Sequence, residues 1–281
     1  MGGPGKNVDG KIDLHSHSLA SDGELEPADV AARAKAAGVG VWALSDHDTV
    51  AGLPAAAAAA KGHGIRFVPG IELSTFLGKK EIHVLGHFLD PVHPALRRFE
   101  DELAVHRRER MERIVERLAG LHVKIRVVDI EKWSGGKTIG RPHVARAIVE
   151  AGHAATIKEA FDRFLGEGKP AYVSRFRLEV ADAVTLVRSA GGTATIAHPG
   201  VSRIDARAMA KLRAVGVDGL EVHHADHDPG MRERFLRMAE GLDMIPTAGS
   251  DYHGEHVAPD RHFGDVSMHA DDLARLEARR P

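Results

Sequence analysis

Short strings of histidine and carboxylate residues are spread along the whole chain, and most of them follow an apolar run typical of a β-strand. In chain order they are His15-Ser16-His17, Asp46-His47-Asp48, Ile71-Glu72, Ile82-His83, Ala197-His198-Pro199 and Asp251-Tyr252-His253. Ionisable side chains at strand ends are costly to bury unless they are paired or bind a metal. Ligands that converge from the ends of several strands are typical of α/β barrels, so the strings predict one metal site at a barrel mouth.

The composition limits the kind of metal site and the kind of partner. The chain has 281 residues, enough to bury one barrel-sized core or a domain with an insertion. It contains no cysteine, so a metal must be held by imidazole and carboxylate groups, which suit manganese, iron or zinc. The net charge of −2 gives no electrostatic footprint for binding duplex DNA or a membrane surface.

The first seven residues are rich in glycine and contain no apolar segment. We therefore expect neither a signal peptide nor a transmembrane span, and we expect a cytoplasmic protein. The sequence shows no sign of an obligate protein partner.

Alternating elements predict an α/β fold at both ends of the chain. Strands are expected at 11–14, 39–44, 65–68, 81–88, 193–197, 219–223 and 244–248, and helices at 27–37, 50–63, 178–190, 206–215 and 229–240. Strands that alternate with helices favour parallel pairing. Seven strands are one fewer than a full (β/α) barrel contains.

The middle of the chain is expected to be helical, at 95–118, 142–151 and 156–165. We interpret residues 95–169 as a helical insertion over the active-site mouth that serves as a substrate-binding subdomain. Residues 1–94 and 170–281 then form the barrel domain.

Nine side chains are candidate metal ligands: His15, His17, Asp22, His47, Glu72, His83, His198, Asp251 and His253. Taken singly, several have ordinary alternatives, since Asp22 lies in a turn-like sequence and His83 could be a core histidine. Because one ion uses roughly four to six ligands, nine candidates imply two or three ions. Glu72 is a lone carboxylate between histidine-bearing strands, so we expect it to bridge two of the metal ions.

Together, these motifs resemble the PHP (polymerase and histidinol phosphatase) family of metal-dependent phosphoesterases. The resemblance covers about residues 11–253 and is closest to the branch of 3′,5′-nucleotide bisphosphatases and RNA 5′-exonucleases. It implies a distorted seven-stranded (β/α) barrel with a trinuclear centre, often of manganese.

The resemblance also implies ligand sets. One ion would be held by His15, His17, Glu72 and Asp251, a second by Glu72, His83 and His198, and a third by Asp22, His47 and His253. The histidinol-phosphate phosphatase branch has histidine where this chain has Asp22, which favours the nucleotide branch. The residues predicted to act in catalysis are Glu72, Asp251, His198 and Asp46.

Two segments of the insertion resemble substrate-binding segments of the nucleotide bisphosphatases. Arg141 and His143 open a predicted helix, where an arginine can grip a phosphate with help from free backbone N–H groups. Lys169, Tyr172 and Ser174 lie in a polar loop. Taken alone, Arg141 and Lys169 could be ordinary surface residues. His224, in a histidine-rich stretch after a strand, is a further predicted substrate contact, whereas the roles of His223 and His227 stay open.

The predicted activity is metal-dependent hydrolysis of a nucleotide phosphomonoester. The favoured substrate is the 3′-phosphate of a 3′,5′-bisphosphonucleoside, which would yield the 5′-nucleotide and phosphate. The alternative is a 5′→3′ exoribonuclease that cleaves short RNA at the same metal centre. A histidinol-phosphate phosphatase and a non-catalytic metal-binding module fit the sequence less well.

Overall fold

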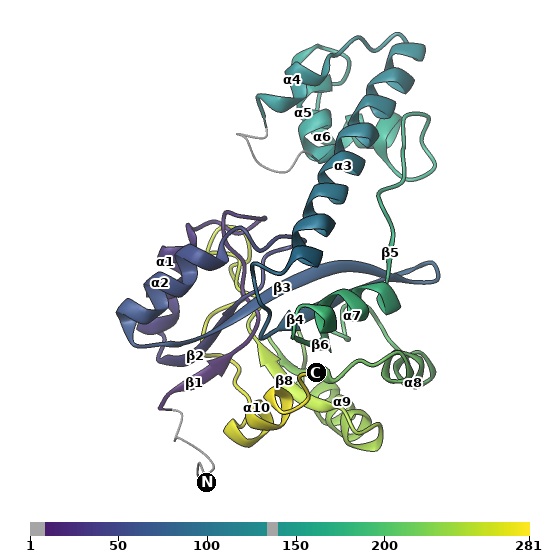
Figure 1. Ribbon diagram of the computed structural model, residues 1–281. Coiled ribbons are helices and arrows are strands. Elements are labelled where there is room, and N and C mark those ends of the chain that lie inside the picture. The colour runs from purple at the N-terminus through teal and green to yellow at the C-terminus, as the bar shows by residue number, and fades with distance from the viewer. Residues whose placement is uncertain (1–8, 134–139) are drawn as a thin grey trace. The chain divides into compact units, whose positions relative to one another are not determined.

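The computed structural model describes residues 9–133 and 140–281, and its main sheet has the strand order β1-β2-β3-β4-β6-β7-β8 (Figure 1). The strands are β1 Lys11–Asp13, β2 Val39–Leu44, β3 Arg66–Leu77, β4 Lys80–His87, β6 Thr193–Ile196, β7 Gly219–His224 and β8 Ile245–Gly249. A two-residue strand, β5 (Leu178–Glu179), pairs with β3 beside this path. Residues 1–7, where we expect no signal peptide, lie outside the described residues.

The seven-strand path nearly closes on itself. Leu14, just after β1, donates its backbone N–H to Ala248 of β8 at 3.0 Å, and Ser16 and Tyr252 form a parallel bridge beyond it. This arrangement confirms the predicted distorted seven-stranded barrel.

The predicted parallel pairing is correct for β1, β2 and β3 and for β6, β7 and β8, but it is wrong around β4. Strand β4 is antiparallel to both β3 and β6. The strand expected at 65–68 continues through Pro69 to Leu77, and a two-residue turn leads directly into β4. Gly78 in this turn has a φ of 61°, a conformation that glycine adopts without strain. A parallel pair would need a crossover of a dozen or more residues, which this segment lacks.

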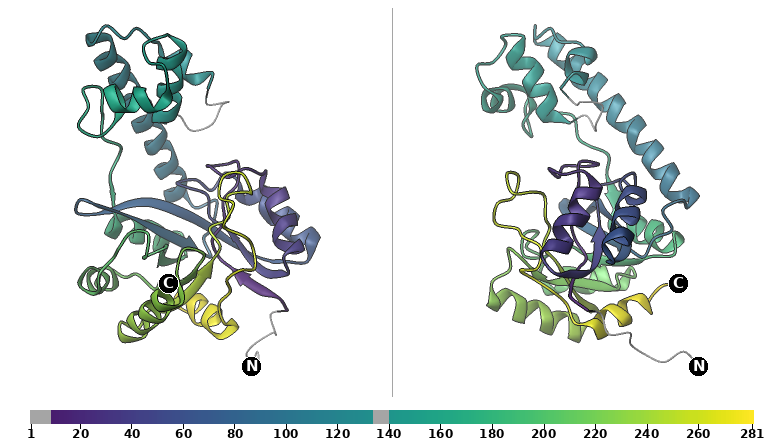
Figure 2. Two further views of the ribbon diagram at one scale, coloured as in Figure 1. Left: turned by 180° about the vertical axis from the view of Figure 1, so that it is seen from behind. Right: turned by 90° about the vertical axis from the view of Figure 1, so that its left-hand side faces the viewer.

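Helices cover the outer side of the barrel. They are α1 Pro27–Ala36, α2 Leu53–His63, α7 Val180–Ser189, α8 Ala206–Ala214, α9 Pro229–Gly241 and α10 Ala270–Glu277. Helix α9 packs on β7 and β8, and α10 packs on β8 (Figure 2). We did not predict α10, although its buried Leu273 and Leu276 join the cluster that contains Ile12 and Ile245.

Residues 98–177 form a separate compact unit with its own hydrophobic core. Its elements are α3 Pro94–Gly120 (which begins in the barrel unit), α4 Val127–Glu131, α5 Arg141–Glu150, α6 Ile157–Ala160 and the π-helix η1 Phe161–Leu165. The unit extends past the expected boundary at 169 because Ala171 and Val173 belong to its core. The position of this unit over the barrel mouth stays a prediction. Among the described residues, no helix is both long and apolar enough to cross a membrane.

Candidate metal centre

A first group of ligand-type side chains forms just beyond the ends of β1 and β8 and beside the middle of β3, which carries Glu72. His15 and His17 are fully buried, and their Nε2 atoms lie 3.1 Å apart. Glu72 Oε2 lies 3.3 Å from the first of these nitrogens and 3.1 Å from the second, and Asp251 Oδ1 lies 3.2 Å from both. The structure therefore brings together all four residues predicted to hold one ion.

Glu72 connects this group to a second one. Its other oxygen, Oε1, lies 2.9 Å from His83 Nδ1 and 3.0 Å from His198 Nε2. These two histidines come from β4 and from the loop after β6. The antiparallel β3–β4 pairing places His83 close to Glu72 across the hairpin, opposite Ser74. Glu72 thus faces histidines through both oxygens, as the expected bridging role requires.

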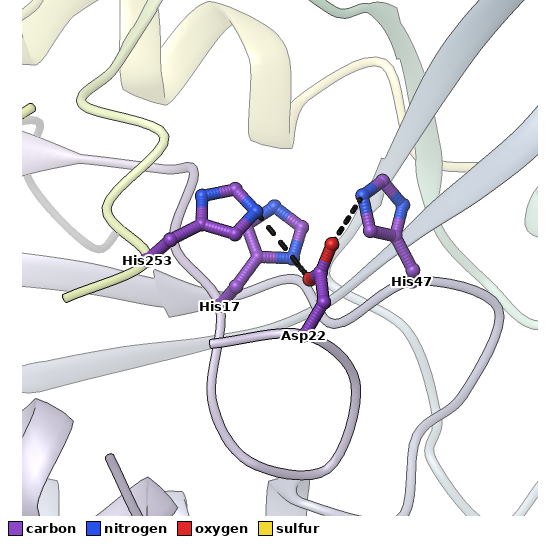
Figure 3. A group of neighbouring side chains, drawn as sticks. All are labelled: His17, Asp22, His47 and His253. Atoms are coloured by element: carbon purple, nitrogen blue, oxygen red, sulfur yellow. Dashed lines mark ion pairs between the residues drawn. The ribbon is translucent and has the colours of Figure 1, made fainter. Parts of the chain in front are cut away.

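A third group surrounds Asp22 (Figure 3). The Asp22 carboxylate lies 3.4 Å from His253 Nε2, 3.7 Å from His47 Nε2 and 3.6 Å from His17 Nδ1. The expected third set contained Asp22, His47 and His253, and the structure adds the second nitrogen of His17 to it. The His47 ring likewise faces two groups, because its Nδ1 lies 3.1 Å from Glu72 Oε2.

The arrangement of the donor atoms suits coordination of metal ions better than hydrogen bonding between the side chains. Buried His17 Nδ1, His47 Nδ1 and Glu72 Oε2 have no hydrogen-bond partner among the described residues. His47 Nδ1 and Glu72 Oε2 lie 3.1 Å apart without forming a hydrogen bond, and His17 Nδ1 lies 3.6 Å from Asp22, beyond the usual hydrogen-bond distance. Buried polar atoms are rarely left unsatisfied, and convergent imidazole and carboxylate donors suit Mn²⁺, Fe²⁺ or Zn²⁺.

The charges of this cluster are strongly coupled. Burial opposes ionisation of Glu72, yet the neighbouring His47, His15 and His83 hold its pKa well below the usual range. Burial would lower the pKa of His17 and of His83, but nearby carboxylates, Glu72 among them, raise these values to about 9 and about 10. At His47 burial dominates and lowers the pKa to about 4.

Asp46, predicted to act in catalysis, lies beneath the turn that carries Asp22. Its buried carboxylate accepts hydrogen bonds from Ser18 N at 2.8 Å, from Ser18 Oγ at 2.7 Å and from Ser21 Oγ at 2.6 Å. These bonds fix the turn next to the third group. The catalytic role of Asp46 stays a prediction.

The predicted substrate contacts of the insertion all lie in the second compact unit. The guanidinium of Arg141 lies 5.5 Å from the ring of Tyr172, and its Nη1 lies 3.4 Å from Leu165 O. His143 Nδ1 accepts a hydrogen bond from Gly140 N at the start of α5. Lys169 and Ser174 are exposed. The structure thus brings Arg141 and Tyr172 together.

His224 lies behind Asp251 rather than on an open surface. Its fully buried ring has Nδ1 accepting from Asp226 N at 3.1 Å, and its Nε2 lies 3.4 Å from Asp251 Oδ2. Its predicted contact with substrate stays a prediction. Arg261 pairs with the same Asp251 oxygen and, at 2.7 Å, with Asp226.

Among the residues that contact the ligands, sequence reasoning missed Arg261 and Glu221. Arg261 lies in an irregular segment with no pattern that marks it. The buried Glu221 has Oε1 3.0 Å from His15 Nδ1, and its Oε2 accepts the backbone N–H of His198 at 2.7 Å. Glu221 lies in the middle of β7, so the rule that selected the other candidates, an ionisable residue near the end of an apolar strand, did not mark it.

A cavity of about 460 Å³ adjoins the third group. Asp22 and His253 line one side of it, and Asp226 and residues 257–261 line the rest. Its volume lies in the usual range of small-molecule sites, about 300–1,000 Å³.

Comparison with known proteins gives a consistent result. The PHP domain family matches residues 13–186. The 5′-3′ exoribonuclease Rnm of Salmonella typhimurium is 34% identical over 247 residues, which cover 86% of this chain and 84% of that protein. A 3′,5′-nucleoside bisphosphate phosphatase of Chromobacterium violaceum is 35% identical over 269 residues, which cover 93% of this chain and 92% of that protein.

A solved structure shows the same similarity in three dimensions. This protein from Bifidobacterium adolescentis, described as a candidate metal-dependent phosphoesterase, is 29% identical and superposes with a TM-score of 0.77 over 96% of each chain. The family match covers more than half of the chain, and the relatives exceed 30% identity over most of it. The chain therefore belongs to the PHP family of metal-dependent phosphoesterases, as its motifs predicted.

Proposed function

We propose that this enzyme hydrolyses the 3′-phosphate of 3′,5′-bisphosphonucleosides to give a 5′-nucleotide and phosphate. The observation that carries the proposal is the convergence of three donor groups on Glu72 and Asp22. The similarity to the bisphosphate phosphatase of Chromobacterium violaceum, over 93% of this chain, supports the choice of substrate.

The donor sets would hold two or three divalent ions, with Mn²⁺ favoured over Fe²⁺ and Zn²⁺. His15, His17, Glu72 and Asp251 would hold one ion, Glu72, His83 and His198 a second, and Asp22, His47 and His253 a third. Such ions activate water near neutral pH and neutralise charge on phosphoryl oxygens. The role of the chain is to fix the spacing of the donors and to orient the substrate.

Substrate orientation is assigned to the insertion. Arg141 and Lys169 would hold the phosphate that is not cleaved, with a hydrogen bond from Ser174. Arg141 stands at the first turn of α5, the positive end of the helix dipole, which also favours an anion. Tyr172, next to Arg141, offers an aromatic face to a nucleobase. His143 holds the backbone at the start of the same helix.

A second candidate function is 5′→3′ exonucleolytic cleavage of short RNA at the same centre. The similarity to the Salmonella typhimurium exoribonuclease favours it. A net charge of −2 does not support tight duplex binding, but it is compatible with a few nucleotides in a pocket. Rates for a bisphosphonucleoside and for a 5′-phosphorylated oligoribonucleotide, measured with one enzyme preparation, decide between the two. Faster turnover of the oligonucleotide would reverse our assignment.

Removing a ligand of the first group should abolish hydrolysis. We expect His15→Ala and Asp251→Ala to lose detectable turnover, because each removes a donor to the ion next to Glu72, while the far-ultraviolet circular dichroism spectrum stays that of the wild type. His63→Ala, at the exposed end of α2, is the matched histidine control and should keep full activity. Near-normal turnover in either ligand variant would refute the metal assignment.

Removing Arg141 should weaken substrate binding more than it slows chemistry. We expect Arg141→Ala to raise KM for a bisphosphonucleoside by roughly 10- to 100-fold, since a hydrogen bond to a charged group contributes about 1.5–3 kcal/mol. The KM for a substrate with a single phosphate should change little. Arg146→Ala, exposed on the same helix, is the control. An unchanged KM for the bisphosphorylated substrate would exclude the proposed role.

Metal binding should release protons and strengthen as pH rises. Without metal, the raised pKa values of His17 and His83 keep both rings protonated at neutral pH. The contribution of these protonated rings to the stability of the metal-free fold is complete below about pH 6.5. It is lost as pH rises through about 9 to 10. A metal needs the neutral ring, so apparent Mn²⁺ affinity should increase from about pH 6.5 to about pH 8.5.

Calorimetric titration with Mn²⁺ in buffers of different ionisation enthalpy measures both the Mn²⁺ affinity and the number of protons released on binding. His47, whose pKa is about 4, is neutral in this range and should contribute no proton. An affinity that is constant over this range, with no proton released, would contradict the assignment of His17 and His83 as ligands.

A further inference from the structure

Glu221 is a fully buried carboxylate that belongs to none of the three donor groups. It lies in the middle of β7, and both of its oxygens contact residues assigned as metal ligands. Burying a carboxylate is costly, so its two contacts require an explanation.

The first contact determines which nitrogen of His15 is available. Glu221 Oε1 lies 3.0 Å from His15 Nδ1, while His15 Nε2 faces Glu72 and Asp251. A carboxylate can only accept a hydrogen bond here, so it favours the ring form with the proton on Nδ1. In that form Nε2 presents its lone pair to the first group. Histidine ligands of metals are commonly held in this way by a carboxylate.

The second contact fixes the backbone of His198. This residue has a φ of 26°, a conformation that residues other than glycine rarely adopt. Its N–H donates to Glu221 Oε2 at 2.7 Å, a hydrogen bond strengthened by the charge of the acceptor. His227, in the loop after β7, holds the same turn by accepting from Gly200 N at 3.1 Å. The turn directs His198 Nε2 to within 3.0 Å of Glu72 Oε1.

The neighbouring strand leaves space for this arrangement. A Cβ atom at Gly249 of β8 would lie 2.1 Å from His15 Cβ and 2.5 Å from Glu221 Oε1. Only glycine lets β8 approach the pair this closely, since real Cβ contacts are longer. The close packing of Glu221 and His15 is therefore built into a third strand.

We propose that Glu221 is a positioning residue that sets His15 and His198 on the two sides of Glu72, so that the first and second ions depend on it together. The inference rests on the metal assignment of the proposed function. Glu221 belongs to neither donor group and would act through the two histidines.

Glu221→Gln tests this directly because it preserves shape and removes one acceptor. The backbone N–H of His198 can only donate, so the amide oxygen should face it and the amide NH₂ should face His15. The ring then accepts at Nδ1 and carries its proton on Nε2, where it blocks the ion. We expect Mn²⁺ affinity to fall by about 10- to 100-fold, with the thermal unfolding temperature of the metal-free protein far less affected.

Asp218→Asn is the matched control. Asp218 is also buried, and it accepts a backbone N–H from Ala194 of β6 at 3.0 Å and pairs with Arg188, outside the donor groups. This variant should lose stability and keep its Mn²⁺ affinity. If Glu221→Gln does not fold, Glu221→Asp replaces it, because the shorter carboxylate cannot reach both donors and should also weaken Mn²⁺ binding.

Three outcomes separate the possibilities. Weaker Mn²⁺ binding by Glu221→Gln, together with loss of the hydrogen-bonded Nδ1–H signal of His15 in ¹⁵N NMR of the Zn²⁺-loaded protein, supports the inference. Unchanged Mn²⁺ affinity in this variant overturns it. A wild-type protein that binds no Mn²⁺ overturns the proposed function and, with it, the inference.

Discussion

The site depends on one buried carboxylate, Glu72. Its two oxygens lie within 2.9–3.3 Å of nitrogens from five histidines that come from different parts of the chain: His15, His17, His47, His83 and His198. A carboxylate excluded from water is unstable as an anion unless positive charge surrounds it. In the metal-free protein His15, His17 and His83, whose pKa values are raised, supply that charge as protonated rings, and divalent ions would supply it in the working enzyme.

The barrel is shaped to bring these groups to Glu72. Parallel strands β1, β2, β6 and β8 deliver ligands from their carboxyl ends, as in other barrels. The antiparallel β3–β4 hairpin departs from that plan, and it serves the same end by holding His83 across from the strand that carries Glu72. Glu221 supports the arrangement from within β7.

Much of this could be predicted from sequence, because metal ligands stand out when they follow apolar runs. All nine candidate ligands lie in the three groups or in contact with Glu72. Other features depend on tertiary structure. His17 belongs to two groups because its two ring nitrogens face different carboxylates, Asp22 and Glu72. The ligand sets expected from the sequence placed His17 in the first group alone. The antiparallel course of β4 follows from a two-residue turn at Gly78 that strand–helix alternation does not reveal. Arg261 lies in an irregular segment, where periodicity gives no signal.

Anomalous scattering from crystals grown with Mn²⁺ would locate the bound ions relative to Glu72. We expect one peak on each side of Glu72, about 3.5–4 Å apart, because the carboxylate would bridge two ions. A third peak should lie among Asp22, His47 and His253 if all three groups are filled. A map with no peak in contact with Glu72, or with metal bound only elsewhere, would contradict a metal centre bridged by Glu72.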